Sequence, residues 1–71
     1  MKLTTRGRFA VTSMIDIALY GKNGPVRLAD IARREQISVA YLEQIFGRLR
    51  HAELVTANRG PGGGYRLARP P

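Results

Sequence analysis

The sequence predicts a mainly α-helical domain that ends in a small β-hairpin. Two observations support this fold class. Apolar residues recur at helical spacing from residue 5 to about residue 52, and a glycine-rich stretch then separates two short segments with strand character. The 71 residues allow one domain at most. A chain this short has a stability margin on the order of 3–5 kcal/mol.

Residues 5–20 are predicted to form the first helix. Thr4 or Thr5 can cap its N-terminus, and glycine, asparagine and proline at residues 21–25 end it. Its apolar residues cover an arc of roughly 200°, whereas an amphipathic surface helix needs about 100°. The excess apolar surface either faces a partner or is wrapped on two sides by the small domain itself.

Two further helices are predicted at residues 28–35 and 39–52, joined by a tight turn at residues 36–38. The alternating residues 26–28 are a candidate short strand. Ser38 is a favourable N-cap for the third helix. An apolar stripe at the spacing i, i+3, i+4, i+7 marks the buried side of the third helix: Leu42, Ile45, Phe46 and Leu49.

The end of the chain reads as a β-hairpin with a long glycine-rich tip. Residues 54–57 and 65–67 have strand character, and RGPGGG at residues 59–64 lies between them. Pro70 and Pro71 are expected to follow the last regular structure.

The charge indicates a polyanionic partner. Twelve lysines and arginines against five acidic residues give a formal net charge of +7, and the cations are spread along the chain. Residues 54–71 contain arginine and no acidic residue. The chain has no cysteine and one histidine, which excludes disulfides and thiolate chemistry within it and leaves little for a metal site or a catalytic triad. We therefore expect no enzyme, no catalytic residues, no metal site and no small-molecule substrate.

Three helices, with a tight turn between the second and third, followed by a basic hairpin, form the element order of a winged helix-turn-helix. In that fold the third helix enters the major groove, where each base pair shows a distinct pattern of donors and acceptors. Tyr41, Glu43 and Gln44 are the predicted base-reading residues. Glutamine can pair with adenine, and glutamate can accept from cytosine. The competing interpretation of Glu43 is a solvated helix residue.

The hairpin tip has its own rationale as a DNA contact. Glycines let the backbone approach phosphates closely, and the minor groove attracts arginine. Arg59 is therefore predicted to enter the minor groove, unless it is a solvated arginine on a flexible turn. Weaker candidates for contact with the DNA backbone share either positive charge, a position at a helix start, or a place in the tip: Lys2, Arg6, Arg8, Ser38, Ala40, Arg48, Arg50, Gly60, Gly62, Gly63 and Gly64.

Other polar residues receive structural interpretations. His51 is expected to be a surface residue or a phosphate contact, and Asp16 and Asp30 are expected to be acids on helix surfaces.

Four segments in order resemble the DNA-binding domain of the IscR family of iron–sulfur cluster regulators: MKLTTRGRFAVTSMIDIA (1–18), PVRLADIA (25–32), SVAYLEQIFGRLR (38–50) and RGPGGGY (59–65). The resemblance implies a bacterial, cytoplasmic, homodimeric transcription factor. It also implies a long dimerisation helix and a loop of three cysteines and a histidine that binds a [2Fe–2S] cluster. Both lie after the wing, so residues 1–71 would be the winged helix-turn-helix domain alone, without the dimerisation and cluster-binding region.

The resemblance adds two expectations. Gln36 and Glu53 stand where the family often has glycine, so a positive φ at either position would cost on the order of 1 kcal/mol. Ala40 stands where serine is common, which removes one polar contact. Because the dimerisation helix of the family packs near the first helix, part of Val11, Ile15 and Leu19 is predicted to be exposed.

The leading hypothesis is a sequence-specific DNA-binding transcriptional regulator of iron–sulfur cluster biogenesis genes, acting as repressor or activator. The alternatives are a related regulator without a cluster, such as a cysteine-metabolism repressor, and a protein-interaction module that docks through the first helix. Membrane association is disfavoured because no apolar stretch approaches the about 20 residues of a membrane span.

Overall fold

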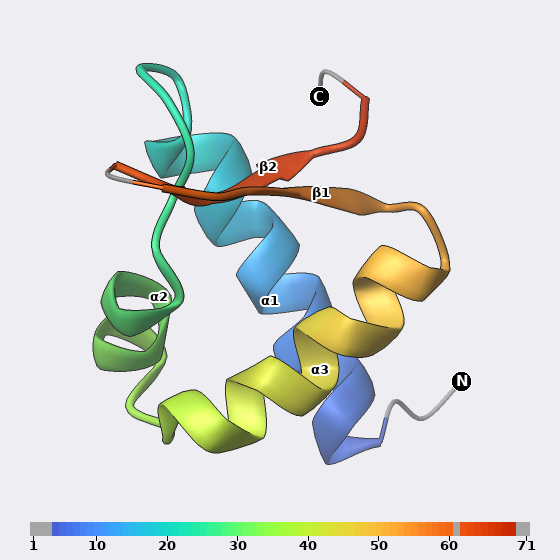
Figure 1. Ribbon diagram of the computed structural model, residues 1–71. Coiled ribbons are helices and arrows are strands. Elements are labelled where there is room, and N and C mark those ends of the chain that lie inside the picture. Colours follow the sequence, from blue (N-terminus) through green and yellow to red (C-terminus); the bar gives the residue numbers. More distant parts are fainter. Residues whose placement is uncertain (1–3, 61, 70–71) are drawn as a thin grey trace.

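Three helices and a two-stranded antiparallel hairpin make up the computed structural model, which describes residues 4–60 and 62–69 (Figure 1). The elements are α1 (Thr5–Tyr20), α2 (Leu28–Glu35), α3 (Val39–His51), β1 (Val55–Asn58) and β2 (Gly64–Leu67). Val55 pairs with Leu67 and Asn58 with Gly64. The predicted fold class and element order are confirmed, with bounds that agree within one residue. Lys2, Pro70 and Pro71 lie outside the described residues.

The predicted side-chain N-caps are present at the starts of α1 and α3. The backbone N–H of Gly7 donates to Thr4 Oγ1 at 3.0 Å, and that of Tyr41 donates to Ser38 Oγ at 3.1 Å. Each cap satisfies one of the N–H groups that the first turn of a helix leaves without a partner.

Two non-glycine residues end helices in the left-handed region. Gln36 has φ 58° and Glu53 has φ 61°. The Gln36 N–H donates to carbonyls of α2, and Ile37 N–H donates to Ala32 O at 3.1 Å, which turns the chain sharply towards α3. The condition raised for these two positions is therefore met, and each residue adopts the conformation that glycine favours.

The core lies where the three helices meet the inner face of the hairpin. Its buried apolar side chains are Ile17, Val26, Ile31, Ala32, Leu42, Ile45, Phe46, Leu49 and Val55. The Phe46 ring packs against Tyr65 with their centroids 4.7 Å apart. The predicted short strand at residues 26–28 is reduced to a single bridge, in which Val26 and Tyr65 exchange backbone hydrogen bonds of 2.9 and 2.8 Å.

Helix α1 buries two polar side chains and leaves three large aliphatic ones exposed. Ser13 and Asp16 are buried beside Ile17, whereas Val11, Ile15 and Leu19 are 47%, 52% and 63% exposed. The predicted exposure of these three apolar residues is confirmed. The interpretation of Asp16 as a surface acid is wrong, because a cation from α2 meets it in the interior.

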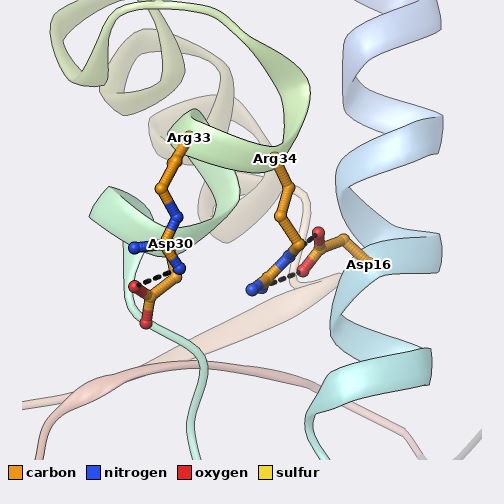
Figure 2. A network of polar contacts seen from close by, with 4 residues as sticks. All are labelled: Asp16, Asp30, Arg33 and Arg34. Carbon is orange, nitrogen blue, oxygen red and sulfur yellow. Dashed lines mark hydrogen bonds and ion pairs between the residues drawn. The ribbon is translucent and has the colours of Figure 1, made fainter.

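That cation is Arg34, which joins α2 to α1 (Figure 2). Its Nε lies 2.6 Å from Asp16 Oδ2 and its Nη2 lies 2.7 Å from Oδ1, a two-point pairing of guanidinium and carboxylate. The Arg34 guanidinium also stacks 4.2 Å from the centroid of the Tyr20 ring. Its hydrogen bonds to Asp16 raise the pKa of Arg34 above its ordinary value. A second pair, Asp30–Arg33, lies on the surface of α2 with 3.4 Å between its charged atoms.

Replacing Arg34 with methionine is expected to lower the free energy of unfolding by about 3 kcal/mol, because it leaves the Asp16 carboxylate buried without its partner. Arg33→Met is the matched control on the same helix, and it is expected to cost about 0.5 kcal/mol because its ion pair is exposed. Urea denaturation followed by circular dichroism measures both. Equal losses would show that the Asp16–Arg34 pair has no special role.

Replacing Gln36 with glycine is expected to raise the free energy of unfolding by about 0.5–1 kcal/mol, since glycine adopts the left-handed conformation without the steric cost of a Cβ atom. Gln36→Ala keeps the Cβ atom and serves as the control, with little expected change. Thermal unfolding of the two variants side by side tests the expectation, and an alanine variant as stable as the glycine variant would contradict it.

Candidate nucleic-acid interface

One side of α3 faces solvent and carries the predicted reading residues. Its buried side contacts the core through the apolar stripe, and Glu43 and Gln44 are exposed on the rest of the helix. Ala40, Gly47, Arg48 and His51 are exposed with them. Tyr41 is half-buried, because its ring packs edge-to-face on Phe9 of α1 with 6.0 Å between centroids. Glu43 and Gln44 are therefore accessible to a partner, and Tyr41 is partly accessible.

The first turns of α1 lie along one flank of this face, and Figure 1 shows α3 crossing the N-terminal half of α1. Arg6 Nη2 donates to Gln44 Oε1 at 3.3 Å. A shallow groove of about 210 Å³ separates the two helices there; its lining is Thr4, Arg6, Gly7, Ala10, Ile45, Arg48 and Leu49. Arg6 and Arg48 thus bring positive charge to the edge of the α3 face.

The tip of the hairpin needs glycine for steric reasons. Gly60 and Gly62 have φ of 94° and 73°. A Cβ atom on Gly63 would lie 2.5 Å from Asn58 O, and one on Gly64 would lie 2.5 Å from Val26 O. These glycines set the path of the chain around the exposed Arg59, while the backbone of Gly60 accepts from Gly63 N–H at 2.9 Å.

Arg59, from the hairpin tip, and Arg50, from α3, line the same groove. This open groove of about 570 Å³ is lined by Arg50, Glu53, Val55, Thr56, Ala57, Arg59 and Ala68. Within the described residues, the ion pairs use Arg33 and Arg34. Helices α1 and α3 and the hairpin therefore carry six exposed arginines outside these ion pairs, which are available to a polyanion: Arg6, Arg8, Arg48, Arg50, Arg59 and Arg66.

The chain has no residues suited to an iron–sulfur cluster. It contains no cysteine, and residues 4–60 and 62–69 include no group of three or more potential metal ligands. In the same part of the chain, no helix is long and apolar enough to cross a bilayer.

Sequence reasoning missed two contacts that tie α1 to α3, namely Phe9–Tyr41 and Arg6–Gln44. Both join residues more than thirty positions apart, and no local pattern marks them. Only the packing of the two helices brings these side chains together.

Comparison with known proteins places the chain among bacterial regulators. The profile of the Rrf2 family, described as an iron-dependent transcriptional regulator, matches residues 3–71. The HTH-type transcriptional regulator IscR of Aliivibrio salmonicida is 61% identical over 71 residues, which cover 100% of this chain and 42% of that protein. The IscR of Photobacterium profundum is 63% identical over 67 residues, which cover 94% of this chain and 39% of that protein.

Solved structures agree in fold. CymR, the global cysteine regulator of B. subtilis, superposes with a TM-score of 0.93 at 42% identity and covers 100% of this chain and 55% of its own. IscR of T. potens gives a TM-score of 0.90 at 46% identity, and the match covers 100% of this chain and 52% of the T. potens chain. The chain spans about two fifths of the length of the curated relatives it matches.

Replacing Gly64 with alanine is expected to break the bridge between the hairpin and residue 26, because the new Cβ atom would collide with the Val26 carbonyl. The amide protons of Val26 and Tyr65, which form that bridge, should then exchange with solvent at least tenfold faster in hydrogen-exchange NMR. Gly47→Ala, which meets nothing within 4 Å, is the control and should leave both rates unchanged. Unchanged protection in the Gly64 variant would contradict the steric argument.

Proposed function

Because the chain belongs to the Rrf2 family of transcriptional regulators, we propose that residues 1–71 are the DNA-binding domain of a sequence-specific regulator of iron–sulfur cluster biogenesis genes. One observation carries the proposal. The exposed polar face of α3 is bordered by arginines that no ion pair engages within the described residues. A helix with a polar outer face and cationic borders suits a major groove lined by phosphates.

In the proposed complex α3 lies in the major groove and Tyr41, Glu43 and Gln44 read base edges. Their hydrogen-bonding groups differ, so together they discriminate base pairs, each good pairing by about 1–3 kcal/mol. Arg59 enters the adjacent minor groove from the hairpin. The proposed backbone contacts are Lys2, Arg6, Arg8, Ser38, Ala40, Arg48, Arg50 and the tip glycines.

Dimerisation and cluster binding are proposed for the whole regulator. The exposed apolar side of α1, formed by Val11, Ile15 and Leu19, is a suitable contact for a dimerisation helix. A [2Fe–2S] cluster would require ligands outside residues 1–71, since this chain has no cysteine. We place such a DNA-binding regulator in the cytoplasm.

The related cysteine regulator remains the second candidate, on the strength of the CymR superposition. The sequence favours the first assignment, because the curated IscR relatives are 61–63% identical, whereas the CymR structure is 42% identical.

Selection of duplexes from a random pool, using the 71-residue chain at low salt, tests the function. Recovery of a defined sequence supports it. Equal binding of the selected and scrambled duplexes would show a basic nucleic-acid binder without sequence preference.

Glu43→Ala and Arg59→Ala are expected to affect DNA binding differently. Removal of the Glu43 carboxylate should relax the preference at one base pair by about 1–3 kcal/mol with small loss of overall affinity. Removal of Arg59 should weaken binding to duplexes with a narrow minor groove about tenfold and lower the salt slope of log K by about 1. Fluorescence anisotropy over a salt series measures both effects.

Lys22→Ala is the matched charge control. Lys22 lines a groove at the far end of α1, with Ile17, Arg66 and Leu67, away from α3. The Lys22→Ala variant should bind DNA with the affinity of the parent chain, within about twofold. An Arg59 variant no weaker than the Lys22 variant would remove Arg59 from the interface.

A further inference from the structure

The contact between Arg6 and Gln44 identifies which end of the Gln44 amide meets the guanidinium. Arginine has only donors, so the group that it meets must be the carbonyl oxygen Oε1, and the Nε2–H₂ group lies at the opposite end of the amide. The guanidinium donates at 3.3 Å, and its charge strengthens a hydrogen bond that two neutral groups would hold less firmly.

The packing of the helices holds this contact in place. Arg6 and Phe9 lie three residues apart on α1, and Tyr41 and Gln44 lie three residues apart on α3, so each pair shares one face of its helix. Phe9 meets Tyr41 edge-to-face at 6.0 Å, and Arg6 meets Gln44 one turn further along. The half-buried Phe9–Tyr41 contact sets the distance between the two helices. The exposed Arg6–Gln44 hydrogen bond depends on that distance.

We propose that Arg6 is a positioning residue for base readout: it occupies one lone pair of the Gln44 carbonyl oxygen and so fixes the orientation of the amide that meets the base. This inference rests on the proposed function. A glutamine that pairs with adenine through both ends must accept from N6 and donate to N7. Oε1 has two lone pairs, so it can accept from Arg6 and from adenine N6 at the same time. With its orientation fixed by Arg6, the amide offers an acceptor and a donor in the order that adenine requires, and the parent chain therefore prefers adenine over guanine at the base pair that Gln44 contacts.

A second role for Arg6 is a plain phosphate contact, and the two roles predict different results. A phosphate contact carries no sequence information, so its loss weakens all duplexes alike and lowers the salt slope by about 1. Loss of a positioning contact changes the base preference at a single position. Base preference therefore separates the two roles whatever happens to overall affinity.

The test compares Arg6→Met with the parent chain on duplexes that carry adenine or guanine at the position assigned to Gln44. Gln44→Ala identifies that position, because its loss of preference is confined there. The parent chain is expected to prefer the adenine duplex by at least fivefold. Arg6→Met lets the amide turn over and is expected to bind the two duplexes within about threefold. In a chain that already carries Gln44→Ala, Arg6→Met should cause no further change in base preference.

Arg8→Met is the matched control, since Arg8 is also exposed in the first turn of α1 and stacks on Phe9 without a hydrogen bond to α3 in the described residues. It should lose affinity uniformly and keep the parent preference. An Arg6→Met variant with the parent's base preference, or a parent chain that binds the adenine and guanine duplexes within threefold, overturns the proposal.

A measurement without DNA separates this inference from the proposed function. The side-chain NH₂ resonances of Gln44 in a ¹H–¹⁵N spectrum should shift in Arg6→Met and stay in place in Arg8→Met. Unshifted Gln44 resonances in Arg6→Met contradict the contact itself. If the resonances shift and the parent chain shows no base preference anywhere, the proposed function has failed and the assignment of a reading role to Arg6 fails with it.

Discussion

The buried pair of Asp16 and Arg34 determines how α1 lies in the domain. Two short hydrogen bonds join the carboxylate of α1 to the guanidinium of α2, and the Tyr20 ring stacks on the same guanidinium. A buried carboxylate is costly without a partner, so the side of α1 that carries Asp16 must face α2. The opposite side, with its aliphatic residues, is thereby turned to solvent. The orientation of the first helix thus reflects this ion pair together with the burial of Ile17 in the core.

This orientation also organises α3. With α1 held against α2, its first turns lie beside the exposed face of α3, where Phe9 supports Tyr41 and Arg6 reaches Gln44. The hairpin closes the other side of the core through Phe46–Tyr65 packing and the Val26 bridge. The side chains proposed to meet DNA therefore come from three elements whose relative positions are set by the same small core.

Features governed by local chemistry could be predicted from the sequence. The caps at Thr4 and Ser38, the breakers after residue 20 and the glycine-rich tip each act within a few residues, and the structure has all of them. Asp16 was misread because its partner is eighteen residues away on another helix. The Arg6–Gln44 contact could not be predicted for the same reason, because its two residues lie on different helices. The chemistry of each predicted site residue is visible in the sequence, whereas the neighbour that orients it depends on tertiary packing.

Helix α1 has sixteen residues, so it spans about 24 Å as a single rigid rod. One end carries Arg6 against α3, and its outer side further along carries Val11, Ile15 and Leu19. A partner bound to those aliphatic side chains would contact the same helix, α1, whose Arg6 contacts the Gln44 amide. A displacement of α1 by a fraction of an ångström would change the hydrogen bond at its N-terminal end. The geometry of that bond is therefore sensitive to contacts on a surface outside the proposed DNA interface.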